Sequence, residues 1–415
     1  MVLIPAKMGR INKRALLGCL QRVGEASRAD LAKSLGLSQP TAGKIADDLL
    51  RLGVLEEIDE EAVATRRNGR RALDDRAKVG RPGRILRLNR SRPRFLAIQL
   101  GVSETNLAAL PVGAASDDRW AVQVKTPSSA EVWVRQLKIA AVKMRLEDLW
   151  GVLVSVPGIV DEPGAKILFS PNLHWTESAD LPGLIHRVWR APVVLVQEER
   201  ALALGHQYVD PDEEDFLLVD FGEGVGGAAI VAGKPYTPLL PLSGELGHTP
   251  VLGNHRRCGC GAVGCIETLV SKRGLMQSFA ASHPDRLQSW QELAKITEEE
   301  GVPPWLSETL QATAVVISGA LNVLGLRRVI ITGTLTELPP VVMAGLSQAI
   351  VKGAMWARFG AVKVEAAPRR RTAGLVAVGI DRLVLPMEKR FRNEEGAPTA
   401  SVSQKTPGGW LSYNE

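Results

Sequence analysis

Residues 243–268 read SGELGHTPVLGNHRRCGCGAVGCIET and contain three of the four cysteines of the chain. The segment gathers His248, Cys258, Cys260 and Cys265, whose imidazole and thiolates are ligands that tetrahedral Zn²⁺ prefers. Three thiolates and one imidazole complete a tetrahedral shell with no open position, which is typical of a structural zinc site. Gly259 and Gly261 give the backbone the freedom to fold tightly around one ion. A disulfide plus one free thiol is the alternative, but nothing else in the chain indicates an oxidising compartment, so the pattern favours zinc.

The length and composition are those of a globular protein with more than one domain. A chain of 415 residues is too long for one compact core, so two or three domains are expected. Hydrophobic residues make up 45% of the chain and charged residues 23%, as in ordinary globular proteins. No apolar run is long enough to cross a bilayer, and the N-terminus lacks the features of a secretion signal. We therefore expect a cytoplasmic protein that does not insert into a membrane.

The charge of the chain is unevenly distributed. Residues 1–94 contain 21 lysines and arginines against 11 aspartates and glutamates, a net charge of +10, whereas the rest of the chain has a net charge of −4. Such a basic segment predicts a polyanionic partner, most simply nucleic acid. Charge alone leaves a merely solvated basic surface open as the alternative.

The basic segment has the spacing of a helix–turn–helix. Apolar periodicity predicts a helix over residues 11–24, a second helix after Ser27, and a third over 39–52 that follows Ser38 and ends before Gly53. In such a motif the start of the last helix enters the major groove of double-stranded DNA. The residues expected to contact DNA there are Ser38, Gln39, Thr41, Ala42 and Lys44. A three-helix protein-interaction module is the alternative, and the basic charge favours DNA.

From residue 95 onward, predicted strands alternate with predicted helices, which indicates an α/β fold. The expected strands lie over residues 95–102, 120–125, 151–161, 193–197, both arms of a hairpin at 216–231, and 327–333, with helices over 129–149, 198–207 and 307–324.

Two motifs resemble a known family. GELGHT followed by CGCGxxGCIE is similar to the signature of the ROK family, which contains bacterial sugar kinases and sugar-responsive repressors. Residues 27–57 and the GRPGR motif at 80–84 resemble the DNA-binding domain of ROK repressors. The resemblance runs piecewise from about residue 10 to 385. It implies an α/β protein with an N-terminal winged helix–turn–helix and a two-lobed, actin-like ATPase (ribonuclease H-like) body that binds sugar.

The domain boundaries follow from these patterns. We expect a helix–turn–helix domain at 1–58, an extended wing and linker at 59–92, a sugar-binding body at 93–388 and a disordered tail at 389–415. Arg81 and Arg84 flank the Gly-Pro turn of the wing, where arginine suits a narrow minor groove. Residues 56–79 are longer and more charged than the usual hairpin of the family. Whether they contact DNA or form a solvated loop stays open.

The resemblance also implies a sugar site. SPNLHW is similar to the PNLxW motif of the family and implies Asn172 as a hydroxyl ligand. Glu245 and His248 in GELGH and Glu267 in CIE match further sugar contacts, and Glu198 stands where the family has its catalytic base. Carboxylates and amides recognise vicinal hydroxyls in fixed directions. Each residue alone could be a surface charge or a helix cap, but together they favour a sugar site in which His248 also binds zinc.

The residues needed for phosphoryl transfer are altered. The kinases of the family carry a phosphate loop Asp-x-Gly-x-Thr, and here the aligned residues are Gln99, Gly101 and Ser103. Gln99 is a poor replacement for a carboxylate on Mg²⁺. In GEGVGGA, Glu223 replaces the hydroxyl of GTGVGGG that would meet a phosphate, and in QEER, Glu198 replaces the Asp of NDAN. These three changes predict that the protein is not an enzyme.

The sequence therefore predicts a DNA-binding transcriptional regulator, a repressor, whose effector is a sugar or a sugar derivative. We expect a homodimer or homotetramer in which closure of the lobes changes the spacing of the DNA-binding domains. An active sugar kinase with an attached DNA-binding domain is the alternative. A nonspecific nucleic-acid scaffold without a ligand is a third hypothesis.

Overall fold

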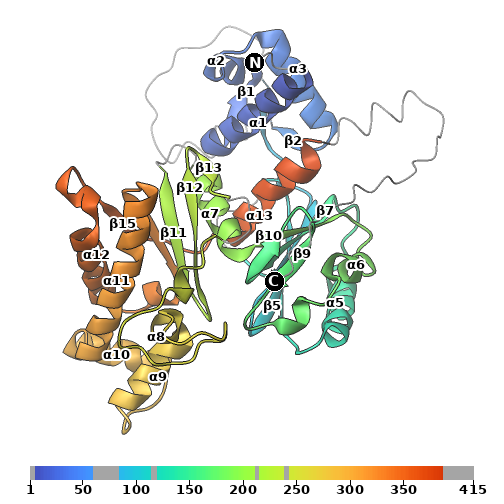
Figure 1. Ribbon diagram of the computed structural model, residues 1–415. Coiled ribbons are helices and arrows are strands. Elements are labelled where there is room, and N and C mark those ends of the chain that lie inside the picture. The colour runs from blue at the N-terminus through green and yellow to red at the C-terminus, as the bar shows by residue number, and fades with distance from the viewer. Residues whose placement is uncertain (1–4, 59–83, 114–118, 211–214, 238–242, 387–415) are drawn as a thin grey trace, which may run out of the picture.

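The computed structural model describes residues 5–58, 84–113, 119–210, 215–237 and 243–386. They form a small helical domain stacked on two lobes, each built around a five-stranded sheet (Figure 1). The expected order, a winged helix–turn–helix followed by a two-lobed α/β body, is confirmed. The predicted tail and residues 59–83 of the predicted wing lie outside the described residues. No helix within the described ranges is long and apolar enough to span a bilayer.

The N-terminal domain contains three helices and a three-stranded antiparallel sheet of order β1–β3–β2. Its elements are α1 (Pro5–Val23), β1 (Glu25–Ser27), α2 (Arg28–Ser34), α3 (Gln39–Arg51), β2 (Leu55–Ile58) and β3 (Ile85–Leu88). Ser27 Oγ accepts a hydrogen bond from the backbone N–H of Asp30 at 3.1 Å, and Ser38 Oγ accepts one from Thr41 at 3.3 Å. Both predicted helix N-caps are therefore confirmed.

The first lobe surrounds a sheet of order β10–β7–β4–β5–β6. Its elements are β4 (Phe95–Leu100), β5 (Glu104–Leu110), β6 (Val122–Lys125), α5 (Ala130–Met144), β7 (Gly151–Val156), β8 (Ile159–Asp161), β9 (Lys166–Phe169), η1 (His174–Thr176), α6 (Leu181–His186), β10 (Val193–Gln197) and α7 (Glu198–Val209). Helices α5 and α6 pack on one face of the sheet through a buried cluster that includes Trp133 and Ile185, and α7 packs on the other face.

The second lobe surrounds a sheet of order β13–β12–β11–β14–β15. Its elements are β11 (Phe216–Phe221), β12 (Val225–Val231), β13 (Lys234–Pro235), η2 (Leu246–His248), α8 (Glu267–Val270), α9 (Lys272–Ser282), α10 (Trp290–Glu300), α11 (Pro304–Leu324), β14 (Arg328–Gly333), η3 (Thr334–Glu337), α12 (Pro340–Gly353), η4 (Met355–Arg358) and β15 (Lys363–Ala366). Helices α8 to α12 enclose one face of this sheet, while Leu202 and Ala203 of α7 lie against the other. Helix α7 therefore contacts the sheets of both lobes.

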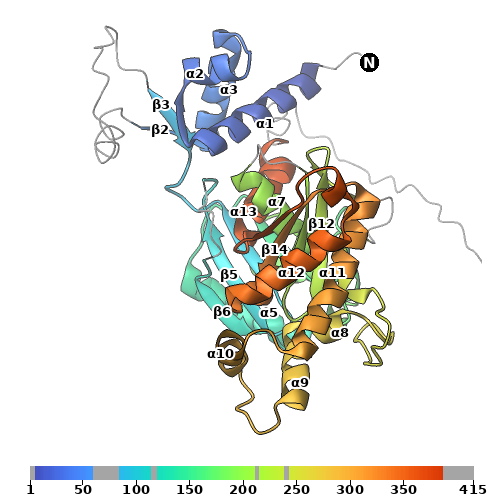
Figure 2. The same cartoon turned by 90° about the vertical axis from the view of Figure 1, so that its left-hand side faces the viewer.

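The chain returns from the second lobe to the first through α13 (Arg371–Gly379) and the π-helical turn η5 (Ile380–Val384). Helix α13 packs along α7 and on β7 of the first lobe. Helix α1 of the N-terminal domain lies across α7 and the α13–η5 end, as both views show (Figures 1 and 2). The N-terminal domain thus rests directly on helices of the body.

Three local predictions about the body were wrong. Strand β5 was not predicted, because it begins with the polar residues Glu104, Thr105 and Asn106, although the last two are buried. The strand predicted over 151–161 is two strands, β7 and β8, since Gly158 turns the chain with φ +90°. The helix predicted over 129–149 ends at Met144, where the next residue adopts a left-handed conformation.

Helices α7 and α13 approach so closely that two glycines are required. A Cβ on Gly374 would overlap the carbonyl oxygen of Ala201, and a Cβ on Gly205 would overlap that of Arg370. We expect Gly374→Ala to lower the free energy of unfolding by about 2 kcal/mol or more, because the helices must separate. Gly319→Ala in α11, where no atom lies within 4 Å of the added Cβ, should instead raise it by about 1 kcal/mol. Denaturant unfolding of both variants measures the contrast, and equal midpoints would contradict the tight contact.

Candidate functional site: a carboxylate-lined cleft beside a Cys₃His cluster

A cleft with a cavity volume of about 350 Å³ lies between the two lobes. The first lobe contributes residues that follow β4, β7 and β9 and the first turn of α7, and the second lobe contributes the β11–β12 hairpin, η2 and α8. All five residues predicted to bind sugar line this one cleft: Asn172, Glu198, Glu245, His248 and Glu267. The structure therefore brings together side chains that are up to 95 positions apart in the sequence, from Asn172 to Glu267.

Each of these side chains is placed by the end of a secondary-structure element. Glu198 is the first residue of α7, directly after β10, and Glu267 is the first residue of α8. Glu267 Oε2 accepts a hydrogen bond of 3.0 Å from the backbone N–H of Val225, which holds the carboxylate against the glycine-rich hairpin. A Cβ on Gly259 would lie 3.3 Å from Asn172 Oδ1, so the cysteine loop packs against the asparagine of the opposite lobe.

The predicted zinc ligands form a compact group beside the cleft. The ligand atoms of His248, Cys258, Cys260 and Cys265 all lie within 4.8 Å of one another. His248 Nδ1 is 3.5 Å from Cys258 Sγ, and the sulfurs of Cys260 and Cys265 are 3.7 Å apart. Ligands about 2.0–2.3 Å from a tetrahedral ion are separated by roughly these distances. The donor set and its spacing therefore fit a structural metal ion.

The thiol of Cys258 would ionise at neutral pH only beside a cation. Burial raises the pKa of Cys258 to about 12, helped by the nearby carboxylate of Glu267 and the thiol of Cys265. A thiol with that pKa stays neutral at pH 7 unless a cation stabilises the thiolate, as a coordinated metal does. The group also touches the cleft directly, because Cys258 Sγ is 3.7 Å from Glu267 Oε1 and His248 Nε2 is 3.7 Å from Glu245 Oε2.

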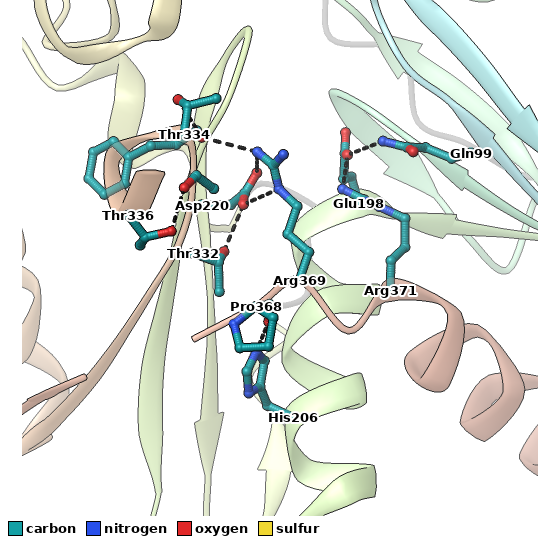
Figure 3. A network of polar contacts seen from close by, with 12 residues as sticks. Gln99, Glu198, His206, Asp220, Thr332, Thr334, Thr336, Pro368, Arg369 and Arg371 are labelled. Atoms are coloured by element: carbon teal, nitrogen blue, oxygen red, sulfur yellow. Dashed lines mark hydrogen bonds and ion pairs between the residues drawn. The ribbon is translucent and has the colours of Figure 1, made fainter. Parts of the chain in front are cut away.

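Two arginines that sequence analysis did not single out hold carboxylates of the cleft (Figure 3). Arg371 forms an ion pair with Glu198, which also accepts a hydrogen bond of 3.1 Å from Gln99 Nε2. Arg369 binds Asp220 in a bidentate manner, with Nε···Oδ1 at 2.7 Å and Nη2···Oδ2 at 2.9 Å. Burial opposes ionisation of Asp220, but the attraction of Arg369 is strong enough that its pKa lies below the usual value. The Asp220–Arg369 pair is therefore ionised at neutral pH.

Protein side chains fill the space around Gln99 and the turn after β11. Gln99 donates to Glu198 and accepts a hydrogen bond of 3.0 Å from Asn106 Nδ2, so its amide is held within the protein. The guanidinium of Arg369 lies over the turns after β11 and β14, since a Cβ on Gly222 or Gly333 would be 2.9 Å or 2.7 Å from its Nη2. Glu223 lines the cleft at the tip of the β11–β12 hairpin.

Glu199 is a further cleft residue that the sequence analysis missed. Burial raises its pKa well above 4.5, and the neighbouring carboxylates of Glu198 and Glu245 raise it further. The folded protein therefore holds this proton more tightly than the unfolded chain does. The stabilisation is complete below the usual pKa of 4.5 and is lost as the pH rises through the raised value.

We therefore expect Glu199→Gln to be more stable than the wild type at neutral pH. The amide cannot ionise, so the difference in stability should shrink as the pH falls from about 8 toward 5. Thermal unfolding across that range measures the difference. The same substitution at exposed Glu308 of α11 is the control. A Glu199→Gln effect that did not change with pH would contradict the assigned environment.

The other charged cleft residues that were not predicted are Asp220, Lys272, Glu337 and Arg369. The run of three arginines at 369–371, directly before an apolar helix, was the one available signal in the sequence for the arginine pair.

The predicted DNA-contacting residues differ in their exposure. Gln39, Thr41 and Lys44 are exposed at the start of α3, whereas Ser38 is exposed but its hydroxyl caps the helix. Ala42 is only 1% exposed and packs inside the domain, so its prediction as a DNA contact is wrong. Its neighbours at helical spacing form the core, and an alanine there fills that core. Arg84 is exposed and forms an ion pair of 2.7 Å with Glu57, and Arg81 lies outside the described residues.

A family model described as "ROK family" matches residues 95–383. The chain belongs to the ROK family. Among ROK proteins, it is 24% identical to the "Xylose repressor" of Caldicellulosiruptor bescii over 69% of this chain and 71% of that protein. It is 23% identical to the "Xylose repressor" of Bacillus subtilis over 80% and 85% of the two chains. It is also 24% identical to the "DNA-binding transcriptional dual regulator NagC" of Escherichia coli over 65% and 64%.

Solved structures show the same ROK fold. A ROK family transcriptional regulator, described as a homolog of the E. coli MLC protein, superimposes with a TM-score of 0.70 at 18% identity and covers 92% of this chain and 98% of that one. A ROK family glucokinase from Streptomyces griseus, in complex with glucose and AMPPNP, gives a TM-score of 0.55 at 20% identity over 68% and 96%. The regulator thus matches the N-terminal domain and the body together.

Proposed function

We propose that this ROK protein is a sugar-responsive transcriptional repressor. The observation that carries the proposal is that one chain joins a helix–turn–helix domain to an interlobe cleft lined by five residues of the sugar-binding pattern. The relatives named xylose repressor and N-acetylglucosamine repressor support the same function. An unphosphorylated sugar or sugar derivative is the effector, and the carboxylates and the amide of the cleft recognise its hydroxyls.

The proposed partner of the N-terminal domain is double-stranded operator DNA. Gln39, Thr41 and Lys44 lie exposed at the first two turns of α3, the part of a recognition helix that reaches base edges. Their amide, methyl and ammonium groups suit adenine, thymine and guanine or phosphate, respectively. A homodimer or homotetramer would place two such helices on the half-sites of an inverted repeat. We place this function in the cytoplasm, where operator DNA is found.

We propose that the body no longer transfers phosphate. The kinase loops would need a carboxylate for Mg²⁺ and donors for phosphate. Here the amide of Gln99 donates a hydrogen bond to Glu198. Arg369 binds Asp220, and its guanidinium lies over the turns where phosphate would be held. Glu223 adds a negative charge that would repel the same anion.

The Cys₃His cluster is proposed to hold one structural Zn²⁺ ion. Its ligands would be His248 Nδ1 and the sulfurs of Cys258, Cys260 and Cys265. The ion would fix the loop that carries Glu245 and Glu267 into the cleft and would neutralise charge among the thiolates. The metal therefore organises the sugar site without taking part in any reaction.

Selection of genomic DNA fragments by the purified protein at physiological salt tests the function. A discrete inverted-repeat site whose binding changes with a sugar supports the repressor. Binding without sequence preference, falling with salt equally for every fragment, would contradict it. ATP turnover with a sugar panel tests the alternative of an active kinase, and turnover that rises in Gln99→Asp/Glu223→Thr would indicate a kinase with damaged loops. No turnover in either protein supports the repressor.

A further inference from the structure

Residues 367–371 form a strap that joins the two lobes. Arg369 of the strap pairs with the second lobe, and Arg371 pairs with a residue at the start of α7. The strap follows β15 of the second lobe and leads into α13, which packs on the first. Arg369 points to Asp220 on β11 of the second lobe, and Arg371 points to Glu198 at the start of α7 (Figure 3). Both partners line the cleft. The strap is thus tied to two walls of the ligand site.

The Arg371–Glu198 tie is largely buried, and the Arg369–Asp220 tie is half-buried and bidentate. The side chain of Arg371 is 2% exposed and that of Glu198 is 15% exposed. Arg369 adds a hydrogen bond of 3.0 Å from Nη2 to the carbonyl oxygen of Phe221, and Thr332 Oγ1 donates to Asp220 at 2.7 Å. Bidentate arginine–carboxylate pairs are the ion pairs with the strictest geometry. A change in the separation of the two lobes must therefore move the strap or break one of these pairs.

The strap is the start of a rigid two-helix unit. Glu198 begins α7 and Arg371 begins α13, so both helices start at the cleft. The helices pack backbone to backbone at Gly205 and Gly374, and His206 Nε2 lies 3.2 Å from the carbonyl oxygen of Pro368 in the strap. Close backbone packing leaves little room for one helix to slide on the other. A displacement at the cleft is therefore carried along both helices together.

The far end of this unit supports the DNA-binding domain. Asp381 of η5 forms an ion pair of 2.8 Å with Arg14 of α1. Leu17 and Leu20 of α1 belong to the same buried apolar cluster as Ile380 and as Leu204 of α7. Figures 1 and 2 show α1 seated on this end in both views. A continuous set of contacts thus runs from the cleft carboxylates to the first helix of the DNA-binding domain.

We propose that Arg369 and Arg371 are positioning residues that convert occupancy of the cleft into movement of the DNA-binding domain. This inference rests on the proposed function and concerns how ligand binding in the cleft regulates DNA binding. A sugar hydroxyl that binds Glu198 competes with Arg371 and Gln99 for the same oxygens. Closure of the lobes around the sugar brings Asp220 toward Glu198 and forces the strap to shift. The α7–α13 unit follows and tilts α1, which changes the spacing of recognition helices in an oligomer.

The first test breaks the contact at the far end of the unit, away from the cleft. Asp381→Lys places a cation opposite Arg14, and Arg14→Asp/Asp381→Lys restores an ion pair with reversed charges. Arg14 is exposed and Asp381 is partly exposed, so both variants should fold. The sugar is whichever of D-xylose, D-glucose and N-acetyl-D-glucosamine the wild type binds by calorimetry. Operator affinity is measured by fluorescence anisotropy with and without that sugar, on the fragment selected from the genome.

The substitution should change the effect of the sugar on operator affinity and leave the affinity for the sugar itself nearly unchanged. Asp381→Lys should bind the sugar within about twofold of the wild type, while the effect of the sugar on operator affinity falls at least about fivefold. The charge-swapped variant should recover the wild-type response. A wild-type response in Asp381→Lys would overturn the inference and leave the repressor function intact. A wild type that binds no operator or no sugar would contradict the proposed function, and the second test then decides the inference.

The second test needs neither sugar nor operator. Hydrogen exchange is compared between Arg371→Gln and Arg286→Gln, a control that removes another ion-paired arginine, between α9 and α10. Loss of the tie at the strap should speed exchange by at least about tenfold in η5 and in the second half of α1 as well as near residue 371. The control should speed exchange only around residues 283–300. Faster exchange confined to the strap in Arg371→Gln would overturn the proposed coupling.

Discussion

We expect the Cys260→Ser variant to lose its zinc ion and, with it, the sugar site. Removal of one of four ligands should reduce the metal content from about one ion per chain to near zero and lower the free energy of unfolding by about 3 kcal/mol or more. Cys258 and His248 each lie 3.7 Å from a cleft carboxylate, so loss of the ion should also displace Glu267 and Glu245. Sugar affinity should then fall at least about tenfold. Metal analysis, thermal unfolding and calorimetry measure the three effects.

The fourth cysteine provides a matched control for this prediction. Cys19 lies buried in the N-terminal domain, 3% exposed, with no metal ligand among its described neighbours. Cys19→Ser should weaken that domain by placing a hydroxyl in its core, but should leave zinc and sugar binding unchanged. Equal zinc content in Cys260→Ser and Cys19→Ser would refute the assigned ligands.

The residues proposed to bind sugar could be predicted from sequence to lie together, because short motifs hold them. Asn172 lies in PNLHW, Glu245 and His248 in GELGH, and Glu267 two positions after a zinc cysteine. The residues of each motif are close together in the sequence, so the chemistry of the motif can be predicted before the fold is known. All of these residues line one cleft in the structure. The N-caps Ser27 and Ser38 were predictable for the same reason, since a cap acts within three residues.

The features that sequence reasoning missed depend on contacts over long distances in the chain. Arg369 and Asp220 are 149 positions apart, and Arg371 and Glu198 are 173 positions apart, so no local spacing indicates these pairs. Ala42 was misassigned because helical position alone suggested the exposed face, whereas packing of α3 against the domain decided its burial. Local rules identify which chemistry a segment carries, and tertiary packing decides which groups meet.

The two ion pairs of the strap hold charged groups of both lobes at the cleft. The guanidinium of Arg369 lies over the two glycine turns that follow β11 and β14. Here Arg369 and Asp220 supply opposite charges at those turns, and Arg371 neutralises Glu198. A ligand that changes the separation of the lobes must therefore act against these two pairs.

We expect Gln39→Ala to weaken binding to the selected operator by about 10- to 100-fold, because a bidentate contact to a base contributes roughly 1–3 kcal/mol of discrimination. Gln39 is the first residue of α3 and is exposed, so the substitution removes a polar side chain without opening the core. Binding to unrelated DNA, which depends on phosphate contacts, should change little. Anisotropy titrations with operator and with scrambled duplex at one fixed salt concentration measure both affinities.

Two further variants separate base recognition from general effects. Gln311→Ala removes an exposed glutamine from α11, far from the DNA-binding domain, and should leave operator affinity unchanged. Lys44→Ala should weaken operator and scrambled duplex alike if its ammonium binds phosphate, and should then reduce the salt dependence by about one ion. It should weaken the operator alone if that ammonium reads guanine. Equal losses on both duplexes for Gln39→Ala would contradict a base contact, and unchanged binding in both Gln39→Ala and Lys44→Ala would exclude the start of α3 as the recognition surface.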